Sequence, residues 1–176
     1  MTSVFDEDHL RFEFDDSWRV VKYDAHRDYL QGIQMLDETK AVDFVALRVV
    51  TGAESEMFWI EVKDFRGYRI QNKRRQADGE LALEVAQKVR DSLAGVIGAL
   101  QTSSTPEDWQ PFVERMRRRE PPMRIVLWLE DDPPPPGSAR RKTGENVQAQ
   151  LLKQRLKWLT TKILVHSLKG VSPPEG

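Results

Sequence analysis

Apolar and charged residues alternate near the start of the chain in a way that predicts strands. Leu10, Phe12 and Phe14 alternate with charged residues, which is typical of a half-exposed strand. A turn at 15–17 and a second strand at 18–23 would complete an N-terminal β-hairpin. Residues 1–8 precede this pattern, and we expect them to be a loose terminus.

Residues 41–67 predict two further strands joined by a turn. The first apolar run, 42–47, contains Asp43, and the second, 57–63, contains Glu61 and Lys63. The segment between them is rich in glycine, serine and threonine, which favours a turn. All three charged residues therefore lie on strands whose other residues are apolar and are expected to be buried.

Helical spacing dominates the rest of the chain. Apolar residues recur every three or four positions over 79–100 and again over 146–168, which predicts two long amphipathic helices. A shorter helix is expected from Pro106 to Met116, and a central strand over 123–130. The predicted fold class is α/β, with a mixed sheet flanked by helices, an N-terminal hairpin and an extra C-terminal helix.

The 176 residues suit one domain with its own core. Four consecutive prolines followed by Arg140, Arg141 and Lys142 predict an exposed, extended loop over 132–146 within that domain. The segment from residue 171 onward is expected to be a tail.

Composition excludes several kinds of site. The chain has no cysteine and only three histidines, so disulfides, thiolate sites and a histidine-rich zinc site are not expected. No apolar stretch is long enough to cross a membrane, and the first residues do not resemble a secretory signal, so a cytoplasmic location is expected. The nucleotide-binding, serine-hydrolase and zinc-protease motifs are absent. Residues 1–64 carry 15 acids and 7 bases, whereas residues 65–176 carry 13 acids and 20 bases.

The three charged strand residues can form one site. Glu61 and Lys63 are two positions apart, so they project from the same face of their strand. A hairpin partner would place Asp43 beside them. Two converging carboxylates suit Mg²⁺, and a neighbouring lysine can stabilise negative charge on a phosphate or orient a water molecule.

Asp43 followed by Glu61-Val62-Lys63 resembles the PD-(D/E)xK nuclease superfamily, whose members have the restriction-endonuclease-like fold. The resemblance implies that Asp43, Glu61 and the Val62 carbonyl bind Mg²⁺ or Mn²⁺, while Lys63 acts in phosphodiester hydrolysis. In parts of the family a glutamine on the next helix lies near the site, and Gln87 has a suitable position. The family's usual proline before the aspartate is replaced here by Val42.

The resemblance also implies a nucleic-acid partner, with DNA the first expectation, and family members often act as dimers or in larger complexes. The segment after Lys63 is basic with an interleaved aromatic, which suits phosphate and base contacts. Its candidate residues are Arg66, Tyr68, Arg69, Lys73, Arg74 and Arg75. Two alternatives remain open: an inactive nucleic-acid- or protein-binding module on the same fold, and an interaction protein in which Glu61 and Lys63 form only a salt bridge.

Overall fold

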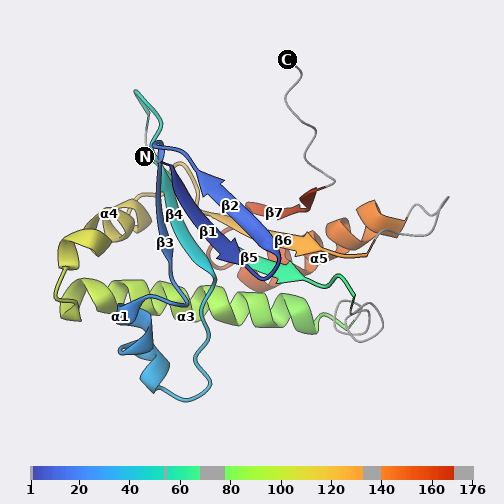
Figure 1. The fold of residues 1–176 in the computed structure, drawn as a ribbon, viewed down its shortest axis with the longest axis horizontal. Coiled ribbons are helices and arrows are strands. Elements are labelled where there is room, and N and C mark those ends of the chain that lie inside the picture. The colour runs from blue at the N-terminus through green and yellow to red at the C-terminus, as the bar shows by residue number, and fades with distance from the viewer. Residues whose placement is uncertain (1, 54, 68–77, 133–139, 169–176) are drawn as a thin grey trace.

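A five-stranded mixed sheet forms the centre of the molecule (Figure 1). The computed structural model describes residues 2–53, 55–67, 78–132 and 140–168. In spatial order the strands are β3 (Trp18–Lys22), β4 (Phe44–Arg48), β5 (Glu56–Asp64), β6 (Arg124–Glu130) and β7 (Ile163–His166). The pairs β3–β4 and β4–β5 are antiparallel, whereas the pairs β5–β6 and β6–β7 are parallel. This arrangement confirms the predicted α/β class with a mixed sheet.

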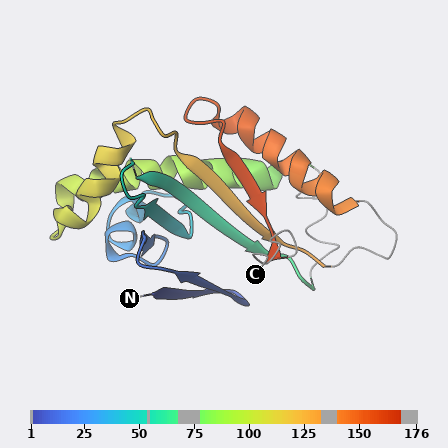
Figure 2. The ribbon, with the colours of Figure 1, turned by 90° about the horizontal axis from the view of Figure 1, so that it is seen from above.

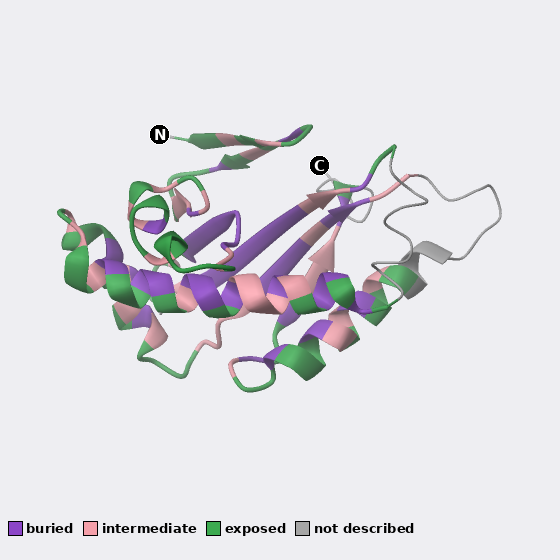
Figure 3. Cartoon of the chain, turned by 90° about the horizontal axis from the view of Figure 1, so that it is seen from below, coloured by how far each residue is buried: buried purple, intermediate pink, exposed green. Residues whose placement is uncertain are grey.

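Helices cover one face of this sheet (Figure 2). They are α1 (Arg27–Leu30), the 3-10 turn η1 (Ile33–Met35), α3 (Glu80–Thr102), α4 (Pro106–Met116) and α5 (Arg140–Leu156). The larger core lies between sheet and helices, where Trp59 and Leu127 from the strands meet Val85 and Trp109 from the helices. Figure 3 shows the result: the central strands β4, β5 and β6 are buried along most of their length, and exposed residues lie on the outer sides of the helices.

An antiparallel hairpin covers the opposite face. Strands β1 (Ser3–Glu7) and β2 (Leu10–Phe14) form a separate two-stranded sheet that packs on the central one through aromatic rings. The ring centroids of Phe5 and Phe12 lie 5.4 and 5.6 Å from that of Phe44. A second, smaller core therefore fills the space between hairpin and sheet.

The prediction of an N-terminal β-hairpin was correct, but the two strands predicted to form it do not pair with each other. Residues 3–7, expected to belong to a loose terminus, form β1 and pair with β2. The strand expected at 18–23 pairs with β4 in the central sheet instead of with 10–14. The reason is burial: the hairpin covers the apolar rings on one face of the central sheet.

The C-terminal prediction needs a larger correction. The helix expected over 146–168 begins at Arg140, inside the loop predicted over 132–146, and ends at Leu156. A turn closed by Leu159 and Thr160 amides on the Leu156 carbonyl then leads into β7. Leu156, Leu159 and Ile163 have helical spacing, but residues 163–166 pair with β6, whose backbone groups on that edge require hydrogen-bond partners that a continued helix could not supply.

The element predictions between residues 41 and 130 are confirmed, whereas residues 133–139 of the predicted loop and the tail predicted from residue 171 onward lie outside the described residues. The strands predicted within 41–67 are β4 and β5, and the helices predicted over 79–100 and 106–116 are α3 and α4. The strand predicted over 123–130 is β6, which lies between β5 and β7. None of the helices in the described ranges has the length and apolarity needed to cross a membrane.

Candidate functional site

Asp43 and Glu61 lie opposite each other where β4 begins. Phe44 pairs with Ile60 across the two antiparallel strands, so the next step of the register sets Asp43 beside Glu61. The two residues are only 5% and 0% exposed. The Val62 amide donates a hydrogen bond of 2.6 Å to Asp43 Oδ2, so this carboxylate serves as an acceptor for the β5 backbone. The predicted convergence of the two acids is thus present in the fold.

Two lysines share one oxygen of Glu61. Lys63 Nζ lies 2.9 Å and Lys88 Nζ 2.6 Å from Glu61 Oε1. The other oxygen, Oε2, is buried and has no hydrogen-bond partner within the described ranges. A fully buried carboxylate with one unsatisfied oxygen is costly, because such groups normally require a proton, a donor or a cation.

Helix α3 supplies the second layer of charge. Glu84 and Lys88 are four residues apart, which places them on the same side of the helix. Lys63 Nζ lies 3.0 Å from Glu84 Oε1, so Lys63 bridges a carboxylate on its own strand and one on the helix. Helix α3 therefore supplies Lys88 to Glu61 and supplies Glu84 as a second partner of Lys63.

Burial and charge shift the pKa values of this group in opposite directions. Burial, together with the negative charge of Glu61, raises the pKa of Asp43 to about 7, although Lys88 and the Val62 amide partly oppose the shift. Burial alone would lower the pKa of Lys63, but the carboxylates of Glu61 and Glu84 outweigh it and raise that pKa. Lys63 is consequently a permanent cation near neutral pH, while Asp43 exchanges its proton there.

A further acidic group adjoins Asp43. One carboxylate oxygen from each of Glu7, Asp24 and Asp43 lies within 4.8 Å of the other two. Lys22 Nζ forms ion pairs with Glu7 and Asp24, the latter at 2.8 Å. Glu7 comes from the end of β1 and Asp24 follows β3, so three separate segments meet at this point.

Sequence reasoning did not find Glu7, Asp24, Glu84 or Lys88. The i, i+4 spacing of Glu84 and Lys88 on a helix with a regular apolar period was the one sequence signal for that pair. Gln87, the helix residue that was predicted, accepts a hydrogen bond of 3.2 Å from Lys40 Nζ, outside the cluster around Glu61. One residue of helical rotation, about 100°, separates it from Lys88.

The predicted nucleic-acid contacts are only partly described. Arg66 Nε donates to Asp64 Oδ1 at 2.8 Å, and the same side chain makes a second contact with the other carboxylate oxygen. This guanidinium is thus already paired with the last residue of β5. Tyr68, Arg69, Lys73, Arg74 and Arg75 lie outside the described residues.

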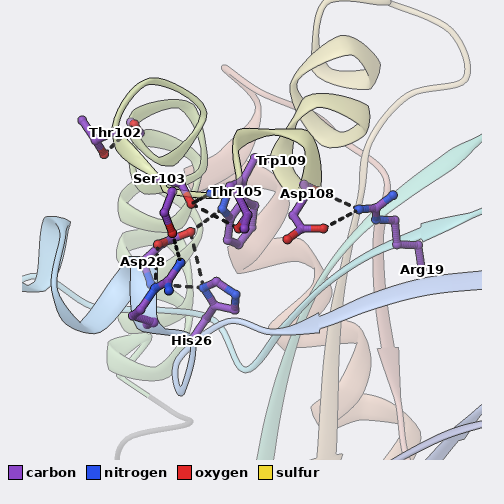
Figure 4. A network of polar contacts seen from close by, with 11 residues as sticks. Arg19, His26, Asp28, Thr102, Ser103, Thr105, Asp108 and Trp109 are labelled. Atoms are coloured by element: carbon purple, nitrogen blue, oxygen red, sulfur yellow. Dashed lines mark hydrogen bonds and ion pairs between the residues drawn. The ribbon is translucent and has the colours of Figure 1, made fainter.

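A second polar network joins α1 to the turn between α3 and α4 (Figure 4). Its residue types include serine, histidine and aspartate, but their geometry is not that of a nucleophilic triad. Asp28 accepts a hydrogen bond of 2.6 Å from Trp109 Nε1, and a hydrogen bond from Ser103 helps to lower its pKa against the effect of burial. His26 Nδ1 accepts the Asp28 backbone amide at 3.1 Å and caps α1. Ser103 therefore contacts the acid and the histidine acts as a helix cap, which indicates a structural anchor.

Comparison with protein-family models, curated proteins and solved structures finds no match to this chain. We therefore infer function from the geometry and charge of the residues around Asp43 and Glu61.

Proposed function

We propose that the protein is a metal-dependent phosphodiesterase that hydrolyses nucleic acid, with DNA as the first expected substrate. The observation that carries the proposal is the pairing of two buried carboxylates, Asp43 and Glu61, on adjacent strands beside Lys63. Burying two acids side by side without a cation between them is unfavourable, so this arrangement is typical of a functional site.

The residues fit a divalent metal ion. Carboxylate oxygens are the preferred ligands of Mg²⁺ and Mn²⁺, and Glu61 Oε2 is a buried oxygen with no other partner among the described residues. Asp43 and Glu61 would hold the ion, together with the Val62 carbonyl that the sequence resemblance implies. When bound, such an ion polarises a phosphate oxygen and makes a coordinated water more acidic.

The surrounding residues have separate tasks in this proposal. Lys63 stays protonated because Glu61 and Glu84 raise its pKa, so it stabilises negative charge at the phosphate and does not act as a general base. Lys88 holds Glu61 Oε1 in place, which leaves the orientation of Oε2 fixed. Asp43 is anchored to β5 by the Val62 amide.

A cleavage assay tests the proposal. Plasmid, linear duplex, single-stranded DNA and RNA are incubated with Mg²⁺ or Mn²⁺, and Lys63→Ala is compared with Lys157→Ala, which changes an exposed lysine. We expect metal-dependent cleavage that falls about 100-fold or more in Lys63→Ala, the usual effect of losing a group that stabilises developing charge, and that is unchanged in Lys157→Ala. Equal cleavage by the two variants would contradict the role of Lys63.

A metal-free binding module is the second candidate. It is favoured by the two lysines that share Glu61 Oε1, because they already supply positive charge to the buried acid. In that case the network is a buried ion-pair cluster that fixes β5 against α3. Such a protein would bind neither Mg²⁺ nor Mn²⁺ at this position and would show no cleavage with any substrate.

A further inference from the structure

Two ammonium groups converge on one carboxylate oxygen of the candidate site. Lys63 Nζ and Lys88 Nζ lie 2.9 and 2.6 Å from Glu61 Oε1, and their side chains are 20% and 16% exposed. Two donors at hydrogen-bond distance from one oxygen lie within about 6 Å of each other, so one phosphate group could accept from both. Like charges this close repel each other, and an anion must lie between them to hold them there.

The two lysines differ in the other contacts that they make. Lys63 Nζ also lies 3.0 Å from Glu84 Oε1, so it has one carboxylate partner on β5 and another on α3. For Lys88, Glu61 is the only ion-pair partner among the described residues. If Glu61 binds a divalent cation, Lys63 still has Glu84 as a counter-charge. Lys88 then has none.

Burial makes the loss of that counter-charge costly. Lys88 lies in the middle of α3 between Val85 and Val89, which are fully buried, and its own side chain is mostly buried. An ammonium group in such a poorly solvated position is unfavourable unless an anion lies beside it. The anion that the proposed reaction brings to this site is a phosphate of nucleic acid, with which an ammonium group forms strong, charge-assisted hydrogen bonds.

We propose that Lys88 is a second catalytic lysine, which pairs with Glu61 before a divalent cation binds and with a phosphate oxygen of the substrate afterwards. The inference rests on the proposed function and deepens it, because it assigns a phosphate contact to a helix residue outside the Glu61-Val62-Lys63 motif. No proton moves in this exchange, and only the ion-pair partner of Lys88 changes.

Calorimetric titration of the full chain with Mn²⁺, with and without thymidine 5′-monophosphate, tests the exchange. This nucleotide carries a phosphate group but no phosphodiester bond, so a phosphodiesterase does not consume it. Saturation with the nucleotide should lower the Kd of the unmodified protein for Mn²⁺ by about 10-fold, and in Lys88→Gln by less than about 3-fold, because the two ligands are coupled through Lys88. The control Lys157→Gln removes the same charge at an exposed position and should behave as the unmodified protein does.

The Kd for Mn²⁺ alone separates this role from a purely structural one. Because the charge of Lys88 opposes another cation at Glu61, Lys88→Gln should bind Mn²⁺ at least as tightly as the unmodified protein. A higher Kd would show that Lys88 only holds Glu61 in place. Lys88→Arg keeps the charge and should retain the nucleotide effect. Lys88→Met provides a second neutral variant with an unbranched side chain, in case Lys88→Gln does not fold.

The outcomes distinguish the inference from the proposed function. If Mn²⁺ binds but the nucleotide lowers its Kd equally in Lys88→Gln and in the unmodified protein, the inference is overturned and the metal site stands. The same conclusion follows if the nucleotide has no effect on the unmodified protein. If the unmodified protein binds no Mn²⁺, both the inference and the proposed function are overturned.

Discussion

At the scale of single residues, Asp43 connects the parts of the site. Its backbone carbonyl accepts the Tyr23 amide at 2.8 Å, and its side chain accepts the Val62 amide at 2.6 Å, so it links β3 and β5 across the start of β4. Its carboxylate also adjoins Glu61 and the Glu7–Asp24 pair. This position explains why the charged form of Asp43 is disfavoured: it is buried and lies among other acids.

The raised pKa of Asp43 predicts how stability depends on pH. Burial and Glu61 raise this pKa from 3.8 to about 7, so between these values the folded protein holds a proton that the unfolded chain releases. The free energy of unfolding should therefore decrease as pH rises from about 4 to about 7, by up to about 1.4 kcal/mol per pH unit from this group. Above pH 7 its contribution becomes constant.

The variant Asp43→Asn tests whether Asp43 lowers the free energy of unfolding as pH rises. The amide oxygen can still accept the Val62 amide, but it cannot ionise, so the variant should gain stability relative to the unmodified protein between pH 5 and pH 8. Urea unfolding with a chelator present measures this difference, and Asp37→Asn, at an exposed position, is the control. A difference in unfolding free energy that is the same at both pH values would show that Asp43 has no raised pKa.

At the scale of elements, the sequence correctly predicted those helices and strands whose residue pattern fits only one kind of element. The apolar runs around Asp43 and Glu61 predicted β4 and β5 correctly, and the period of α3 predicted that helix. Strand β7 was missed because its apolar residues continue the helical spacing of α5, and only its pairing with β6 distinguishes the two. Local periodicity contains no information about such a long-range partner.

Close packing between α3 and the β3 side of the molecule supplies an element-scale prediction. A Cβ added to Gly95 would lie 2.1 Å from the buried Tyr23 hydroxyl and 2.8 Å from Ile33 Cγ2. Gly98, on the same helix, has nothing within 4 Å of the equivalent position. We expect Gly95→Ala to lower the free energy of unfolding by about 1–3 kcal/mol through overpacking. Gly98→Ala should raise it by about 0.5–1 kcal/mol because alanine favours the helix.

Thermal or urea unfolding of the two glycine variants compares them directly. Both substitutions have the same intrinsic helix preference, so a difference between them isolates the close contacts with Tyr23 and Ile33. Similar stabilisation of the two variants would show that α3 does not approach Tyr23 as closely as described.

At the scale of the whole molecule, the site depends on segments that are far apart in the sequence. Residues 43–63 could be linked from the sequence because a single hairpin brings them together. Glu7 could not, because residues 1–8 show no apolar period and their contact with Asp43 arises only when the hairpin packs on the sheet. Lys88 could not be predicted as a site residue either, because its contact with Glu61 depends on where α3 crosses β5, and a helical pattern alone does not specify that crossing.

The most direct test of the account is whether the buried carboxylate pair binds a divalent cation. Calorimetric titration with Mn²⁺ should show one binding event per chain in the unmodified protein. Glu61→Gln, which keeps the acceptor for Lys63 and Lys88 but removes the charge, should abolish that event. A folded protein that gives no binding heat, or a Glu61→Gln variant that binds Mn²⁺ as the unmodified chain does, would contradict the assignment of Asp43 and Glu61 as a metal site.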